Sequence, residues 1–146
     1  MDTSKLSYKL AAGDREIKGA LEVRRQVFVE EQGISEELEV DGRDSEALHM
    51  VVKDGERVIA TARVLFLSAS QAKIERMAVL QPFRRRGIGR RIISFLVEEL
   101  KKKQVEEVFL HAQYLTKAFY RSVGFEERPS PFWEAGIKHV KMRKVL

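Results

Sequence analysis

The sequence predicts an α/β domain of the α+β kind, in which helices pack on a single mixed β-sheet. Apolar or alternating runs typical of strands are interspersed with runs whose apolar residues recur at helical spacing. The Asp-Gly pair at residues 54–55 is typical of a hairpin between two strands. Because 146 residues suffice for one sizeable core, we expect residues 1–146 to form a single domain.

The first half of the chain is expected to supply one strand, two helices and a hairpin. A strand over residues 5–12 precedes a helix that Asp14 caps and that extends to about Gln32. Residues 34–48 are polar and predict a short second helix followed by a loop. The hairpin occupies residues 49–67, which are rich in β-branched residues.

The middle of the chain predicts a strand over residues 72–80, which Pro82 ends. An amphipathic helix then starts at Gly87, and the lysines at 101–103 suit the negative end of its dipole.

The last third predicts three more strands and one short helix. A strand covers residues 105–113, and a helix follows with Thr116 as a candidate cap and Gly124 at its end. Two strands around a Pro/Gly loop complete residues 125–146.

Composition restricts the function classes. Hydrophobic residues make up 44% of the chain and no apolar run approaches the roughly 20 residues of a membrane helix, so we expect no membrane association. The N-terminal residues lack the apolar core of a secretion signal, which favours a cytoplasmic location. The chain has no cysteine and therefore no thiolate nucleophile, and no His/Asp/Glu cluster has the spacing of metal ligands.

Charge is distributed unevenly along the chain. The net charge of +5 suggests an anionic partner. Residues 30–46 nevertheless hold eight carboxylates against Arg43 alone, whereas residues 84–103 are strongly basic. Such a division suits an enzyme that joins an anionic cofactor to a cationic substrate, although two separate solvated faces would give the same pattern.

The segment "QPFRRRGIGRRI", residues 81–92, lies where a predicted strand ends and a helix opens. Backbone N–H groups and the helix dipole can hold an anion there, and Gly87 and Gly89 allow a phosphate to approach closely. A dinucleotide motif would need a third glycine in place of Ile92, and a Walker A motif would need Gly-Lys-Ser/Thr. Both common phosphate loops are therefore excluded.

What remains, Arg84-x-x-Gly87-x-Gly89 after "RMAVL", resembles the acyl-CoA-binding motif of the GNAT superfamily of N-acyltransferases. "AFYRSVGF" follows about thirty residues later, where that superfamily has its tyrosine-containing helix, and the resemblance covers most of the chain from His49 onward. It implies the GNAT fold, a mixed and mostly antiparallel sheet of about seven strands, splayed at the cofactor cleft and flanked by about four helices. It also implies acetyl-CoA as co-substrate.

The resemblance implies a cofactor site built largely from backbone. The amides from Arg84 to Arg90 would hold the pyrophosphate, the Met77 amide would polarise the thioester carbonyl, and Val79 would bind the pantetheine arm. The cofactor-binding candidates are Met77, Ala78, Val79, Arg84, Arg85, Arg86, Gly87, Ile88, Gly89, Arg90, Gln113 and Phe119.

The resemblance also implies a general acid. Tyr120 matches the tyrosine that protonates the departing CoA sulfur, although a tyrosine beside Phe119 could equally be a core residue.

Two residues are candidates for the general base. Strand alternation is expected to put Glu75 on the same face as Met77 and Val79, unless Glu75 forms a salt bridge with Arg63 or Arg76. The alternative is His139, because "EAGIKHVKM" resembles the "GIPHxxM" of the YjcF- and ElaA-like acetyltransferases, with lysine in place of proline.

"RRQVFVEEQGISEELEVDGRD", residues 24–44, also resembles that group and implies a segment over the acceptor side. Its acidic residues could attract a protonated amine.

The predicted function is transfer of an acetyl group from acetyl-CoA to a primary amine of a small molecule or peptide, directly in a ternary complex. A non-catalytic acyl-CoA sensor is the first alternative. A nucleic-acid-binding module is the second, although no helix-turn-helix, zinc finger or aromatic-studded sheet motif supports it. Dimers are common in the superfamily, so a homodimer is a further expectation.

Overall fold

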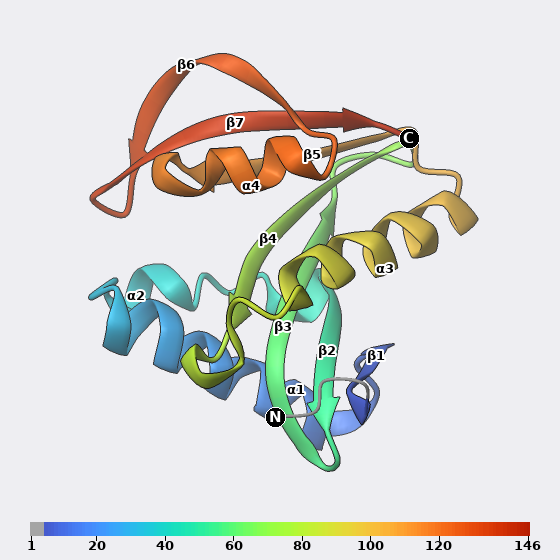
Figure 1. The fold of residues 1–146 in the computed structure, drawn as a ribbon, viewed down its shortest axis with the longest axis vertical. Helices are drawn as coiled ribbons and strands as arrows, with labels where there is room; N and C mark the ends of the chain where they lie inside the picture. Colours follow the sequence, from blue (N-terminus) through green and yellow to red (C-terminus); the bar gives the residue numbers. More distant parts are fainter. Residues whose placement is uncertain (1–4) are drawn as a thin grey trace.

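The computed structural model describes residues 5–146, which form one seven-stranded sheet flanked by helices (Figure 1). The strand order is β1-β2-β3-β4-β5-β7-β6, and every adjacent pair is antiparallel except β4 and β5. This confirms the predicted α/β class and mixed, mostly antiparallel sheet. The strands are β1 (Ser7–Leu10), β2 (Leu48–Asp54), β3 (Arg57–Phe66), β4 (Gln71–Val79), β5 (Glu107–Gln113), β6 (Glu126–Glu134) and β7 (Ile137–Val145).

Four α-helices and several tighter or wider turns connect the strands. The helix α3 has one continuous apolar face, which is buried in the core, and none of the helices among residues 5–146 is long and apolar enough to span a bilayer. The helical elements are α1 (Gly13–Arg24), the π-helix η2 (Arg25–Glu31), α2 (Glu36–Glu39), α3 (Ile88–Lys102) and α4 (Lys117–Ser122), with 3₁₀ turns η3 (Asp44–Glu46), η4 (Gln81–Phe83) and η5 (Tyr114–Thr116).

The first predicted helix needs two corrections. Ala12 occupies its N-cap position and Asp14 lies inside the first turn, where it makes no capping hydrogen bond. The Glu16 carboxylate instead accepts a hydrogen bond from the Ala12 amide at 2.8 Å. The helix also does not continue regularly to Gln32, because its last seven residues form η2.

The turns of the two hairpins lie later in the chain than the residue pattern suggested. Asp54 pairs with Arg57, so the tight turn of the first hairpin is Gly55-Glu56. In the C-terminal hairpin the turn is Ala135-Gly136, and the two prolines lie within β6. Because β6 is an edge strand, it tolerates proline where its register against β7 shifts.

The parallel strands β4 and β5 separate soon after they begin, as Figure 1 shows. They pair only over residues 71–73 and 107–109, and no ladder joins them further along the described chain. We call the diverging parts, residues 74–79 of β4 and 110–113 of β5, the strand fork. The fork confirms the predicted splay of the sheet.

A β-bulge on β4 changes which residues share a face of the fork. Arg76 has φ 53°, and β4 has one residue more than β3 between the pairs Arg63–Glu75 and Thr61–Ala78. Glu75 and Ala78 therefore share one face with Arg63 and Thr61. Val79 lies on the opposite face, so the expected alternation of Glu75 with Val79 is wrong.

The two faces of the sheet are covered by different helices. In Figure 1, α3 lies in front of β2 and β3, whereas α1 lies behind them. The α1 side is the face of Glu75, because α1 packs through Gly19 onto Val58 and pairs Glu16 with Lys53. Met77 and Val79 lie toward α3, so the fork has an α1 face and an α3 face.

Candidate active site

The first turn of α3 presents backbone donors beside the arginine-rich loop. Its first hydrogen bond runs from the Arg91 amide to the Gly87 carbonyl at 3.1 Å, and no side chain in residues 5–146 caps the helix. The amides of Ile88, Gly89 and Arg90 therefore lack an acceptor within the helix. Gly87 has φ 78°, a left-handed conformation that precedes the right-handed helix and is typical of anion-binding backbone nests.

Gly89 is required for a different reason, namely close packing. A Cβ at this position would lie 3.2 Å from Cζ of Phe119 and 3.9 Å from Cε of Met77. Glycine therefore lets the start of α3 approach both α4 and β4. This contact brings together three of the predicted cofactor-binding residues, from three separate segments of the chain.

Arg84 is held by two contacts. Its Nε donates to the Val79 carbonyl at 2.8 Å, and its two terminal nitrogens donate to the Glu31 carboxylate at 2.9 and 2.8 Å. The second contact joins the loop before α3 to the end of η2. The Arg84 guanidinium is thus paired with a carboxylate.

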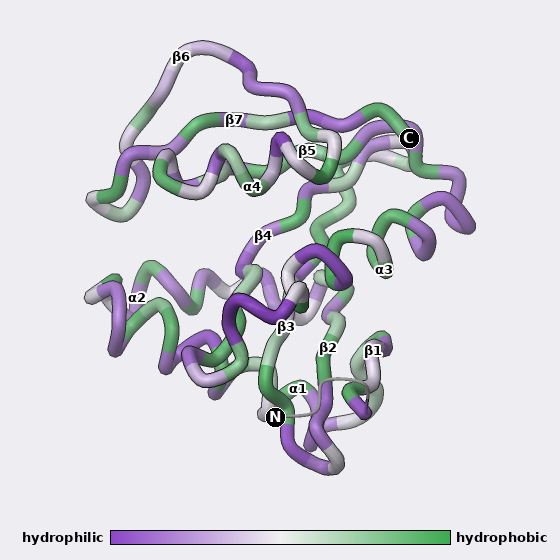
Figure 2. Tube along the Cα trace, in the orientation of Figure 1, coloured by the Kyte–Doolittle hydropathy of each residue, from purple (hydrophilic) through white to green (hydrophobic). Residues whose placement is uncertain are grey.

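The neighbouring arginines leave the loop strongly hydrophilic, as the purple segment before α3 in Figure 2 shows. Arg85 and Arg86 are exposed to solvent. Arg90 donates to Ser122 Oγ at 3.1 Å and, with Lys144, lines a surface depression of about 390 Å³ between α3 and α4. The loop that leads into the free amides of α3 therefore carries exposed cationic side chains.

Tyr120 projects from α4 into aromatic surroundings. Its ring packs edge-to-face on Phe119 at 5.1 Å and on Phe125 at 6.1 Å, measured between ring centroids. Burial raises the pKa of its phenol to about 12, and no residue of the described chain hydrogen-bonds its hydroxyl. The phenol is therefore protonated at neutral pH and free to donate.

Glu75 forms ion pairs within a cluster of charged residues. Its carboxylate accepts a hydrogen bond from Arg63, and Lys73 Nζ lies 3.2 Å from the other oxygen. Burial alone would raise the pKa of Glu75, but the Arg63 hydrogen bond and the charges of Arg63 and Lys73 outweigh it and lower that pKa. Such a carboxylate is a weak proton acceptor.

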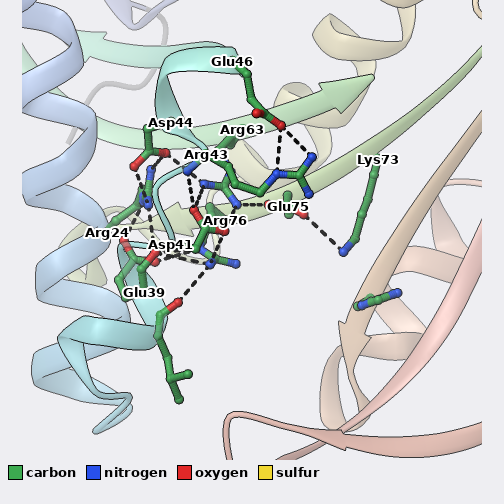
Figure 3. Close-up of polar contacts among 12 residues, drawn as sticks. Arg24, Glu39, Asp41, Arg43, Asp44, Glu46, Arg63, Lys73, Glu75 and Arg76 are labelled. Carbon is green, nitrogen blue, oxygen red and sulfur yellow. Dashed lines mark hydrogen bonds and ion pairs between the residues drawn. The ribbon is translucent and has the colours of Figure 1, made fainter. Parts of the chain in front are cut away.

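The cluster around Glu75 extends through a network of buried charges (Figure 3). Two of its arginines, Arg24 and Arg63, are fully buried, and Asp44 lies between them at 2.6 and 3.0 Å. Arg76 turns away from Glu75 at the bulge and pairs with Glu39 at 2.8 Å. The network consists of Arg24, Arg63 and Arg76 with Glu39, Asp41, Asp44 and Glu75.

This network gives the acidic segment a structural role. Glu39, Asp41 and Asp44 neutralise arginines that the sheet and α1 bury, because a buried guanidinium needs a partner. These three carboxylates are therefore not free to attract a protonated amine, as the sequence had suggested for the acidic run.

His139 lies across the fork from β4. It pairs with Gln113, the last residue of β5, and shares the α1 face with Glu75 because Lys73 and Phe109 are register partners. The side chain is 9% exposed, and its Nδ1 lies 2.7 Å from the Ile137 carbonyl oxygen. A carbonyl cannot donate, so Nδ1 carries the proton and Nε2 has the free lone pair in the neutral ring.

The end of η2 contributes two residues that the sequence reasoning missed. Gln32 Oε1 accepts a hydrogen bond from Gln113 Nε2 at 2.8 Å, while its neighbour Glu31 binds Arg84. The segment of Glu31 and Gln32 thus connects the arginine-rich loop before α3 with β5. A π-helix often occurs at functional sites, but its i→i+5 bonding has no simple residue signature that could have revealed it.

The predicted residues fall into two groups on opposite faces of the fork. Met77, Gly89 and Phe119 meet on the α3 face, beside Tyr120 in the same helix as Phe119. Glu75 and His139 lie on the α1 face. An acyl donor on the α3 side and an acceptor on the α1 side could therefore meet between the arms.

Comparison with known proteins agrees with this arrangement. The family model described as "Acetyltransferase (GNAT) domain" matches residues 8–146. Among curated relatives, YyaT of Bacillus subtilis (strain 168) is 34% identical over 97% of both chains. The N-acetyltransferase YjcF of the same organism is 32% identical over 92% of this chain and 96% of its own.

Solved structures show the same fold. An acyl-CoA N-acyltransferase from Pseudomonas aeruginosa superposes with a TM-score of 0.86 at 25% identity, covering 95% of this chain and 99% of the other. Escherichia coli ElaA gives 0.83 at 24% identity, with 95% and 97% covered. A GNAT acetyltransferase from Elizabethkingia anophelis with acetyl-CoA bound gives 0.74 at 15% identity, with 99% and 100% covered. The chain therefore belongs to the GNAT acetyltransferase family, whose members transfer an acyl group from acyl-CoA.

Proposed function

We propose that this protein transfers the acetyl group of acetyl-CoA directly to a primary amine, with both substrates bound at the strand fork. The observation that carries the proposal is the division of the fork. Free amides and cations lie on its α3 face, and a histidine with a free Nε2 lone pair lies on its α1 face. The chain contains no cysteine that could carry an acyl group between two half-reactions.

On the α3 face, the amides of Ile88, Gly89 and Arg90 would hold the pyrophosphate of acetyl-CoA. Arg85 and Arg86 would add positive charge. The backbone of Met77 to Val79, which no strand pairs on the fork side in the described chain, would bind the thioester and the pantetheine arm.

On the α1 face, we assign the general base to His139 rather than Glu75. Glu75 is engaged by Arg63 and Lys73, and its lowered pKa opposes proton uptake. His139 Nε2 would accept a proton from the amine as nitrogen attacks the carbonyl carbon. Tyr120, which stays protonated at neutral pH, would donate its proton to the sulfur as the C–S bond breaks.

The direct test combines binding with turnover. Calorimetric titration of acetyl-CoA into the wild type should give one equivalent per chain, and Gly89→Glu should abolish binding, because the new side chain would push Phe119 away from the start of α3 and add a negative charge beside the amides that would hold the pyrophosphate. Ser68→Glu is the matched control, since it adds the same charge at an exposed position away from the fork.

The turnover arm is a screen of primary amines with detection of free CoA thiol. Acetylation of at least one amine supports the proposal. Tight acetyl-CoA binding without acetylation of any amine would indicate a cofactor sensor, and absence of binding would refute the cofactor site itself.

A further inference from the structure

A second imidazole and a carboxylate surround His139 on the α1 face. His111 on β5 and Glu134 at the end of β6 meet with Nδ1 3.2 Å from Oε1. The other oxygen, Glu134 Oε2, lies 3.7 Å from Nε2 of His139. Phe132 packs between the two imidazoles, edge-on to His111 at 4.9 Å and stacked on His139 at 5.9 Å.

Each ring of this cluster has a fixed role in hydrogen bonding. The Ile137 carbonyl holds Nδ1–H of His139, so any further proton must enter at Nε2, the nitrogen that faces Glu134. The Glu134 carboxylate is held in turn by His111, which uses only one of its two oxygens. The second oxygen is therefore positioned for the protonated form of His139.

We infer that Glu134 is a positioning residue for the reaction, which acts through His139 by stabilising the imidazolium formed when Nε2 takes the proton of the acceptor amine. His111 has a supporting part, because it orients the Glu134 carboxylate. This inference rests on the proposed function for its chemistry. It assigns to Glu134 no direct contact with acetyl-CoA.

Proton transfer and bond changes balance in this scheme. The amine nitrogen forms the new N–C bond while the C–S bond breaks, and the thiolate takes the phenolic proton of Tyr120. The amine proton passes to Nε2 of His139 and gives an imidazolium, whose positive charge is stabilised by the Glu134 carboxylate, with Oε2 3.7 Å from Nε2. The Glu134 side chain is 47% exposed, so the proton can return to water along this carboxylate.

The other charges around the cluster are few. Lys141 neighbours His139 on its own face of β7, and β5 contributes His111 and the neutral Gln113. Lys73 on β4 is a further positive charge near Glu134, and its charge lowers the pKa of Glu134. The His111 hydrogen bond is the main cause of the lowered pKa of Glu134, so its carboxylate is ionised at neutral pH.

The first test reads the His139 titration without any substrate. The chain has three histidines, so NMR of ¹³C-labelled imidazoles can be assigned with single histidine substitutions. In Glu134→Gln the midpoint of the His139 titration should move to lower pH by about one unit, as expected for loss of a carboxylate within 4 Å. Glu126→Gln, which removes an exposed carboxylate at the other end of β6, should leave it unchanged.

The second test uses an amine found by the screen described above. The acidic limb of the pH profile of kcat/KM should move to lower pH in Glu134→Gln, in parallel with the NMR midpoint, and kcat should fall about tenfold with little change in KM for acetyl-CoA. Glu134→Asp should recover part of the loss. A merely structural carboxylate would change stability without moving either profile.

The outcomes separate this inference from the proposed function. An unchanged His139 midpoint in folded Glu134→Gln would overturn the inference, whether or not the enzyme turns over. If the midpoint moves but His139→Gln retains full acetyl transfer, the inference fails at its catalytic step while the proposed reaction stands. If no amine is acetylated, the proposed function fails independently of the NMR result.

Discussion

Single residues of the site show how far sequence patterns reach. The glycines at 87 and 89 were found from their place between a predicted strand and helix, and Tyr120 from the resemblance of its segment to the GNAT superfamily. Both are local features of the sequence. Sequence patterns could not decide whether Glu75 pairs with Arg63 or Arg76. A one-residue bulge at Arg76 inverts the alternation, and only the register against β3 reveals it.

The phenol of Tyr120 gives the first prediction at this scale. Tyr120→Phe keeps the aromatic packing on Phe119 and Phe125 but removes the proton donor, so kcat should fall about 10²-fold while the Kd of acetyl-CoA changes little. Steady-state kinetics and calorimetry measure the two quantities. Tyr114→Phe serves as the control, and equal kcat values in the two variants would refute the assignment of the acid.

The two base candidates predict different defects. Glu75→Gln leaves Arg63 short of one counter-charge, so the free energy of unfolding should fall by about 3 kcal/mol while the pH profile of kcat stays in place. His139→Gln should instead lower kcat by about 10²-fold with a smaller loss of stability. Urea unfolding and pH-dependent kinetics distinguish them, and the reverse pattern would make Glu75 the base.

At the scale of elements, the helices and strands were largely predictable because their apolar periodicity is strong. The helix α3 illustrates this, since its buried face is continuous. The irregular elements were not predictable. The π-helix η2 and the bulge of β4 both contact residues distant in sequence, Glu31 with Arg84 and Arg76 with Glu39.

The contact between η2 and the arginine-rich loop before α3 gives a prediction about affinity. Glu31 holds the Arg84 guanidinium, so a phosphate that approaches Arg84 must compete with this carboxylate. Glu31→Gln should therefore tighten acetyl-CoA binding about two- to fivefold, the range expected for a solvent-exposed ion pair. Glu30→Gln, whose partner is Arg25, is the matched control. Weaker binding in Glu31→Gln would mean that the contact organises the loop for the cofactor.

For the whole molecule, the sequence revealed the separation of acidic and basic segments but not its purpose. Part of the acidic segment folds onto arginines of α1, β3 and β4, and the network ties the first third of the chain to the sheet (Figure 3). Long-range pairing of this kind leaves no periodic pattern. The position of the basic loop was predictable, because a strand-loop-helix unit is continuous in sequence.

Asp44 is the residue at which this network is easiest to break. It joins Arg24 and Arg63, so Asp44→Asn leaves two buried guanidiniums with fewer counter-charges, and the free energy of unfolding should fall by about 3 kcal/mol. Asp54→Asn, at the exposed end of β2, should cost less than about 0.5 kcal/mol. Equal losses in urea unfolding would show that the network adds no specific stability.

Acid should unfold the protein through the same carboxylates. Burial opposes ionisation of Asp44 and Glu75, but their arginine partners outweigh it, and the pKa of each is lower in the folded chain than in the unfolded chain. At neutral pH these carboxylates are ionised in the folded and in the unfolded chain, and their full contribution to the free energy of unfolding is present. As the pH falls below about 5, the unfolded chain takes up protons first, so stability decreases and continues to decrease until the folded-state carboxylates are also protonated.

Thermal unfolding at pH 7, 5, 4 and 3 should show a falling Tm, and the fall should be shallower in Asp44→Asn, because one of the linked protons is gone. A Tm that is constant from pH 7 to 3 would mean that these ion pairs are formed equally well in the unfolded chain.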